Sequence, residues 1–172
     1  MNNTRPSVTI SLQPLLVSYC RFIFNTPEAD KEITLRRNHD IAKLIHSQVL
    51  ANDTPVRRAC NTDQVSFILA LDNINRTALQ NHFLYVSAWG EQKIQEGIEY
   101  EFKRWLKNCF DRGYEMFYPQ KTIIEAILRG LNDRTNSANF DAIKKIDYRH
   151  RRKLEETRFN ELLKECQVLV FQ

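Results

Sequence analysis

One ten-residue segment carries most of the positive charge of the chain. Residues 144–153 contain six Lys or Arg side chains against a single acidic one, which gives the segment a charge of +5. The whole chain of 172 residues has a formal charge of +4, so the remaining 162 residues sum to −1. The candidate binding residues in this segment are Lys144, Lys145, Tyr148, Arg149, Arg151, Arg152 and Lys153.

Cations set this closely along a chain are suited to phosphate groups. A nucleic acid that contacts them releases condensed counterions, and each Arg can also make a two-point contact to a phosphate or a guanine. Tyr148 lies among the cations, where it can stack on a base or bond to a phosphate oxygen. The segment therefore predicts a nucleic-acid partner, either DNA or RNA.

Two other interpretations of the segment stay open. Glu155 and Glu156 follow it in sequence, so the cations of a solvated helix face can pair with these and neighbouring carboxylates. The third interpretation is contact with a protein partner or a membrane surface. Because the rest of the chain is close to neutral, the concentration of cations favours nucleic acid.

A helical period gathers these side chains on one face. At about 100° per residue, five of the six cations and Tyr148 spread over one broad arc. The apolar residues on the opposite side are Phe140, Ile143, Ile146 and Leu154. We therefore expect a helix from Asn139 to about Arg158 with a docked apolar face and an exposed basic face, which Leu162, Leu163 and Cys166 can extend.

Two more helices are predicted before the basic one. Apolar residues keep three- and four-residue spacing from Glu91 to Arg112, and Gly113 follows as the expected C-cap. Pro119 suits the first position of a helix that runs to Arg129 and is closed by Gly130. The residues expected on its inward face are Ile123, Ile124, Ile127 and Leu128.

The order of the last two predicted helices resembles a helix-turn-helix whose second helix is basic. The connection over residues 131–138 is about twice the usual three to four residues, so a looser helical arrangement is expected. In its Asn- and Ile-rich composition and basic helical C-terminal part, the chain is also similar to accessory proteins of phages and mobile elements.

The first half of the chain predicts a mixture of strands and helices. Residues 7–12 alternate apolar and polar side chains, which is typical of a half-buried strand. Residues 15–24 are mainly apolar and fit either a strand or a helix after the break at Pro14. A helix is expected over 41–50, capped by Asn38 or Asp40. Further strands are expected at 33–35, 65–71 and 83–89, with a helical turn in the Asn-rich stretch between the last two.

The predicted fold class is therefore α+β, with short strands in a mixed N-terminal half and three helices in a mainly helical C-terminal half. At this length one domain over residues 1–172 is the expected organisation. The alternative is a division into a mixed part over 1–90 and a helical part over 91–172.

One spacing imitates a metal-dependent nuclease. Asp72 follows one predicted strand, and Glu91 and Lys93 follow the next, so two carboxylates could hold Mg²⁺ while the lysine orients a water. Glu91 equally suits the first turn of a helix, where the helix dipole favours a carboxylate, and Lys93 is then a surface residue. We expect no enzymatic activity.

No cofactor or metal site is expected. The four glycines lie too far apart for a phosphate-binding loop, and the four cysteines form no CxxC pair. His39 and His46 share a helix face at a spacing of seven, whereas helical metal ligands more often lie four apart. The thiols are expected to be reduced and mostly buried. The sequence shows no secretory signal and no apolar run that could span a membrane, so a cytoplasmic location is expected.

Two function classes follow from these patterns. The first is a non-enzymatic, nucleic-acid-binding accessory or regulatory protein that acts through the basic helix. The second is a structural or assembly protein of a larger complex or phage particle. Aromatic residues cluster over 100–118, and those of the connector, Tyr114, Phe117 and Tyr118, either pack within the monomer or form a self-association surface.

Overall fold

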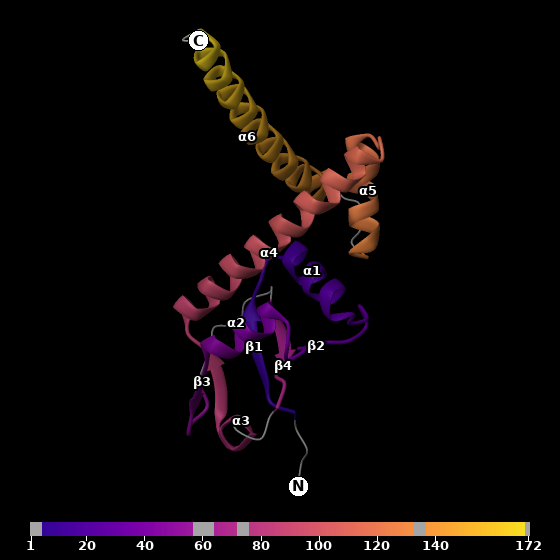
Figure 1. Ribbon diagram of the computed structural model, residues 1–172. Helices are drawn as coiled ribbons and strands as arrows, with labels where there is room; N and C mark the ends of the chain where they lie inside the picture. The colour runs from indigo at the N-terminus through magenta and orange to yellow at the C-terminus, as the bar shows by residue number, and fades with distance from the viewer. Residues whose placement is uncertain (1–4, 57–63, 72–75, 133–136, 171–172) are drawn as a thin grey trace. The chain divides into compact units, whose positions relative to one another are not determined.

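A computed structural model describes residues 5–56, 64–71, 76–132 and 137–170, without the side chains at 76–78, 137 and 165–170. The fold is α+β, as predicted, with short strands in the N-terminal half and a helical C-terminal half (Figure 1). The chain divides into two compact units. Unit 1 comprises Met1–Phe102 and Gly130–Asp133, and unit 2 comprises Lys103–Arg129 and Arg134–Gln172.

A three-stranded sheet lies in unit 1. Strand β4 (Gln64–Ile68) is central and pairs with β1 (Ser7–Ser11) antiparallel and with β2 (Glu32–Thr34) parallel. Val8 lies opposite Phe67, and both side chains are buried, which confirms the face predicted from the alternation. On the other face the hydroxyls of Thr9 and Ser66 are hydrogen bonded at 2.9 Å.

A two-stranded antiparallel sheet is formed by β3 (Val49–Asn52) and β5 (Phe83–Val86). Helix α3 (Arg76–Asn81) precedes β5, in the stretch where a helical turn was predicted. Several predicted boundaries were wrong. Leu50 belongs to β3 rather than to the preceding helix, Trp89 belongs to helix α4 rather than to a strand, and β4 ends at Ile68 rather than at Leu71.

Two helices pack on unit 1 with their apolar faces. Residues 15–24, for which both a strand and a helix were open, form helix α1 (Pro14–Phe24), with Pro14 in its first turn. Helix α2 spans Asp40–Gln48, and neither predicted cap is correct. The N-cap is His39, whose Nδ1 accepts from the backbone N–H of Ile41 at 3.2 Å.

Helix α4 (Ala88–Glu115) is longer than predicted at both ends, and its residues belong to both units. Gly113 lies inside the helix and is not its C-cap. A Cβ atom at this position would lie 2.6 and 2.7 Å from side-chain carbons of Ile123, so a glycine allows the close approach of the next helix.

The left-handed position that ends α4 is Phe117, at φ 60°. The N–H of Tyr118 donates to the carbonyl of Gly113 at 3.0 Å, and the N–H of Phe117 donates to that of Tyr114 at 2.9 Å. These two bonds form a Schellman motif, in which glycine is the usual residue at the left-handed position. A residue with a Cβ atom costs about 1–2 kcal/mol there.

Helices α5 (Gln120–Gly130) and α6 (Ser137–Val170) complete unit 2. The four residues predicted inward on α5 are all buried, and Ile143 of α6 is buried as well. Pro119 precedes α5, where its carbonyl accepts from the N–H of Ile123 at 3.2 Å. Helix α6 continues past Arg158 and includes the predicted extension through Leu162, Leu163 and Cys166. In the described ranges, no helix combines the length and the apolar run that crossing a bilayer requires.

The contact between Gly113 and Ile123 predicts a difference between two glycine variants. Gly113→Ala should lower the free energy of unfolding by about 1–2 kcal/mol, because the added methyl group displaces a buried side chain. Gly130→Ala is the matched control, since nothing lies within 4 Å of its added Cβ, and it should be neutral or slightly stabilising. Urea unfolding followed by tryptophan fluorescence measures both, and equal stabilities would contradict the packing.

Candidate functional site

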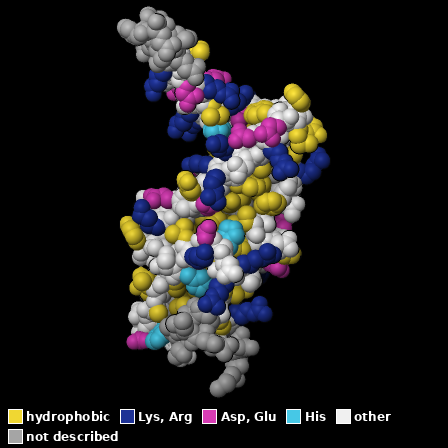
Figure 2. Space-filling view, in the orientation of Figure 1, with side chains coloured by type: hydrophobic (Ala, Val, Ile, Leu, Met, Phe, Trp, Pro, Cys, Tyr) yellow, Lys and Arg dark blue, Asp and Glu magenta, His cyan; other side chains and the backbone are white. Residues whose placement is uncertain are grey.

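The basic residues predicted to bind nucleic acid lie on one stretch of α6, within unit 2. Figure 2 shows Lys and Arg side chains along the described part of this helix, with acidic side chains among them. The exposed members of the predicted set are Lys144, Lys145, Tyr148, Arg149, Arg151, Arg152 and Lys153. Tyr148 is 62% exposed among them. We call residues 144–153 the basic segment.

The cations of the basic segment differ in how they are paired. The Nε of Arg152 donates to Glu156 at 2.9 Å, as the solvated-face interpretation expected for cations of this helix. The Nε of Arg151 lies 3.1 Å from a carboxylate oxygen of Asp147. Within the part of the chain that the structure describes, Lys144, Lys145, Arg149 and Lys153 have no ion pair.

Asp147 is the one acidic residue of the basic segment, and it is buried, with a relative exposure of 1%. Its Oδ2 accepts the hydroxyl of Tyr114 at 2.7 Å and the side-chain amide of Gln120, in addition to the contact from Arg151. These partners come from the end of α4, the first residue of α5 and α6 itself. One carboxylate oxygen therefore joins the three helices of unit 2.

From the sequence, Asp147 was considered only as the one negative charge of the basic segment, and this role was not predicted. A signal for it was present, because at 100° per residue Asp147 falls on the apolar arc, between Phe140 and Ile143. A carboxylate on the docked face of a helix needs donors from the elements that it packs against. The far end of the expected docked face differs from the prediction, since Leu154 is exposed.

The electrostatics around Asp147 hold its donors in place. Burial raises the pKa of Tyr114 to about 12, and the hydrogen bond to Asp147 and its negative charge act in the same direction. The phenol therefore stays protonated and able to donate at neutral pH. The guanidinium of Arg151 also lies over the Tyr114 ring, 5.4 Å from its centroid.

The second oxygen of Asp147, Oδ1, is buried and has no hydrogen-bond partner among the described residues. The Nε2 of His150 is also buried without one, at 3.8 Å from a carboxylate oxygen of Asp111. A buried polar atom left unpaired lowers stability. The contacts to Oδ2 are therefore the ones that offset the burial of the Asp147 charge.

Two of the three residues in the nuclease-like spacing lie among the described residues. Asp72 lies outside the described residues, and Glu91 lies in the first turn of α4, as the helix-start explanation expected. The Nζ of Lys93 is 3.0 Å from Glu96 and 5.7 Å from the centroid of the Trp89 ring. Over the residues with described side chains, no three His, Cys, Asp or Glu are grouped so that they could hold a metal ion.

The histidines and cysteines considered for chemistry have structural surroundings in the described part. His39 caps α2 and its ring packs edge-on against Phe24, with centroids 5.0 Å apart. Cys20 and Cys109 are free thiols, and burial raises the pKa of Cys20 to about 12. Cys60 and the side chain of Cys166 lie outside the described residues.

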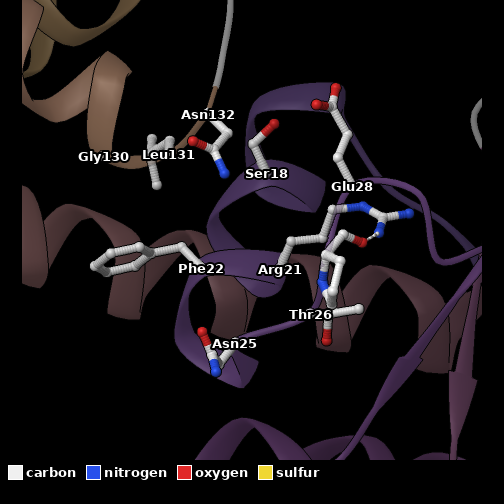
Figure 3. Close-up of a pocket in the computed structure, with 10 residues that line it drawn as sticks. Ser18, Arg21, Phe22, Asn25, Thr26, Glu28, Gly130, Leu131 and Asn132 are labelled. Carbon is white, nitrogen blue, oxygen red and sulfur yellow. Dashed lines mark hydrogen bonds between the residues drawn. The ribbon is translucent and has the colours of Figure 1, made fainter.

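A pocket of about 350 Å³ lies in unit 1, at the C-terminal end of α1 (Figure 3). Its lining includes Ser18, Arg21, Glu28 and Asn132, none of which sequence analysis singled out. Arg21 is already engaged there, because its Nη1 donates to the carbonyls of Pro27 and Asp30, both at 2.8 Å. These bonds close the loop that follows α1.

Comparison with protein-family models, curated proteins and solved structures finds no match to this chain.

The contacts of Asp147 predict graded losses of stability. Asp147→Ala should lower the free energy of unfolding by about 3 kcal/mol, because it leaves the donors of Tyr114, Gln120 and Arg151 without their acceptor. Asp147→Asn keeps an accepting oxygen and should cost less. Asp141→Ala, at an exposed position of the same helix, is the control and should change stability by less than about 0.5 kcal/mol. Urea unfolding measures all three, and an Asp147→Ala protein as stable as the control would refute the role of this carboxylate.

Proposed function

We propose that this protein is a nucleic-acid-binding accessory or regulatory protein that acts through the basic segment of α6. The observation that supports this best is the exposure of Lys144, Lys145 and Arg149 around Tyr148, without carboxylate partners among the described residues. Because the described side chains do not neutralise these cations, their full positive charge is available to attract an external polyanion.

The energetic argument rests on phosphate contacts. Each cation that neutralises a phosphate releases a counterion and adds about 0.9 to the slope of log affinity against log salt concentration on a duplex. The unpaired cations therefore supply a salt-dependent attraction by themselves. Tyr148 adds an exposed ring and a hydroxyl at the centre of the segment.

The other three cations of the segment contribute in different ways. Arg151 is anchored to Asp147 through its Nε, so its remaining nitrogens are held in a fixed orientation. Arg152 can leave its ion pair with Glu156 and bind a phosphate instead at a small cost in free energy, because both side chains of that pair are exposed. Lys153 is exposed next to them.

The proposed activity is binding, and no catalytic step is included in it. A place in a phage or mobile element fits the composition of the chain. A cytoplasmic setting fits the free thiols of Cys20 and Cys109, of which the former is kept protonated by burial. The proposal applies equally to DNA and RNA.

A charge-matched pair of triple variants tests the proposal. Replacing Lys144, Lys145 and Arg149 by Ala should weaken binding to a labelled oligonucleotide at least tenfold at low salt, and lower the salt slope by up to about 3. The control replaces Lys31, Arg36 and Lys107, three exposed cations outside the segment, and removes the same charge. Fluorescence anisotropy at two salt concentrations reads out both variants.

Either of two results contradicts the proposal. One is the absence of binding by the unmodified protein at low salt. The other is an equal loss of affinity in the two triple variants, which would assign the binding to net charge rather than to the basic segment.

A second candidate function is assembly into a larger complex or phage particle. The observation that favours it is an exposed apolar stripe on the distal part of α6, formed by Phe159, Leu162 and Leu163. All side chains from Arg151 to Lys164 are exposed. Light scattering of the purified chain separates the candidates, because a stable higher oligomer without affinity for oligonucleotides supports assembly and contradicts the first proposal.

A further inference from the structure

Phe117 is the most exposed large apolar side chain among the described residues, with a relative exposure of 94%. It lies in the connection between α4 and α5, at the left-handed position of the Schellman motif. The neighbouring side chains, Met116 and Tyr118, are exposed as well. The connection thus presents an aromatic ring to solvent from a backbone position that glycine occupies more easily.

This ring brings no visible benefit to the fold. Its exposure means that it buries little apolar surface, and its positive φ lowers stability relative to glycine. Residues held in sparsely populated backbone conformations cluster at active sites, ligand clamps and switch regions. Phe117 is therefore better explained by a ligand than by packing within the monomer.

The connection is anchored to α6 at both ends. Tyr114 lies three residues before Phe117 and Gln120 three residues after it, and both donate to the same oxygen of Asp147. Tyr148, the exposed aromatic residue of the basic segment, directly follows Asp147 in the chain. The two exposed rings, Phe117 and Tyr148, thus each lie within three residues in the chain of a residue of the Asp147 hydrogen-bond cluster.

We propose that Phe117 is a base-stacking residue and that the nucleic acid recognised by the basic segment is single-stranded, or contains unpaired bases. Cations that follow a phosphate backbone, together with exposed aromatic rings, are the usual means of binding a single strand. In a duplex the faces of the bases are already stacked on each other, so a ring such as Phe117 gains little from it. This inference rests on the proposed function and adds to it the class of nucleic acid.

The test compares one single-stranded oligonucleotide with the duplex of the same sequence by fluorescence anisotropy. Phe117→Ala should weaken binding of the single strand about 5- to 100-fold, which is the range expected for the loss of one stacked base. Binding of the duplex should change less than about twofold. Phe117→Trp keeps a stacking surface and should restore the affinity for the single strand.

A further variant separates binding from folding. Phe117→Gly relieves the strain of the left-handed backbone conformation, so it should raise Tm. It should also weaken binding of the single strand as much as Phe117→Ala does. Opposite signs for stability and affinity exclude partial unfolding as the cause of the lost binding.

Three results would overturn the inference. If Phe117→Ala binds the single strand as the unmodified protein does, while the triple variant at Lys144, Lys145 and Arg149 still loses affinity, the proposed function stands and the stacking role fails. If Phe117→Ala changes only the oligomeric state in light scattering, the ring belongs to a protein interface. If the unmodified protein binds neither oligonucleotide, both proposals fail.

Discussion

The burial of one carboxylate, Asp147, is the constraint on which the arrangement of unit 2 depends. A buried charge needs donors, and the three that reach its Oδ2 come from α4, α5 and α6. Because Asp147 faces inward, the helical period turns Lys145, Arg149 and Arg152 to within about 40° of the opposite direction. The same interaction that joins the helices therefore determines which side chains of α6 face solvent.

Apolar packing in unit 2 supplies most of the burial but little directional information. The buried side chains of α5 are three isoleucines and a leucine, whose burial is a non-directional contribution to stability. Hydrogen bonds to a single oxygen depend on the distance and angle of each donor. The contact between Gly113 and Ile123 adds a second restriction, because it requires a position without a side chain where α4 and α5 approach each other.

The two anchored elements differ in what they present. The basic segment presents cations on a regular helix, and the connection between α4 and α5 presents an aromatic ring on a left-handed residue. In the usual Schellman motif the residue at the left-handed position is a glycine, which ends the helix and presents no side chain. Here a phenylalanine takes that position at a cost in stability, and the structure places it between two residues that contact Asp147.

Much of the local structure could be predicted from the sequence, and the failures have identifiable causes. Alternation identified β1, three- and four-residue spacing identified α4, and the helix predicted between Pro119 and Gly130 was α5 with all four of its buried residues. The parallel pairing of β2 with β4 could not be predicted, because it joins residues 34 positions apart in the chain with no local signal.

The candidate site was predicted in part. The exposure of the basic segment follows from charge and period alone. The burial of Asp147 was missed because its donors, Tyr114 and Gln120, are 33 and 27 residues away. The left-handed position was assigned to Gly113 from its residue type, whereas the structure uses that glycine for packing and turns the chain at Phe117.

The most direct measurement is a titration of the isotope-labelled protein with a short single-stranded oligonucleotide, followed through backbone amide NMR signals. The perturbed amides should cluster at residues 144–153 and 116–118, and those of β1, β2 and β4 should stay unchanged. Perturbations confined to residues 5–102, or none at a protein concentration of about 0.1 mM and low salt, would contradict this prediction.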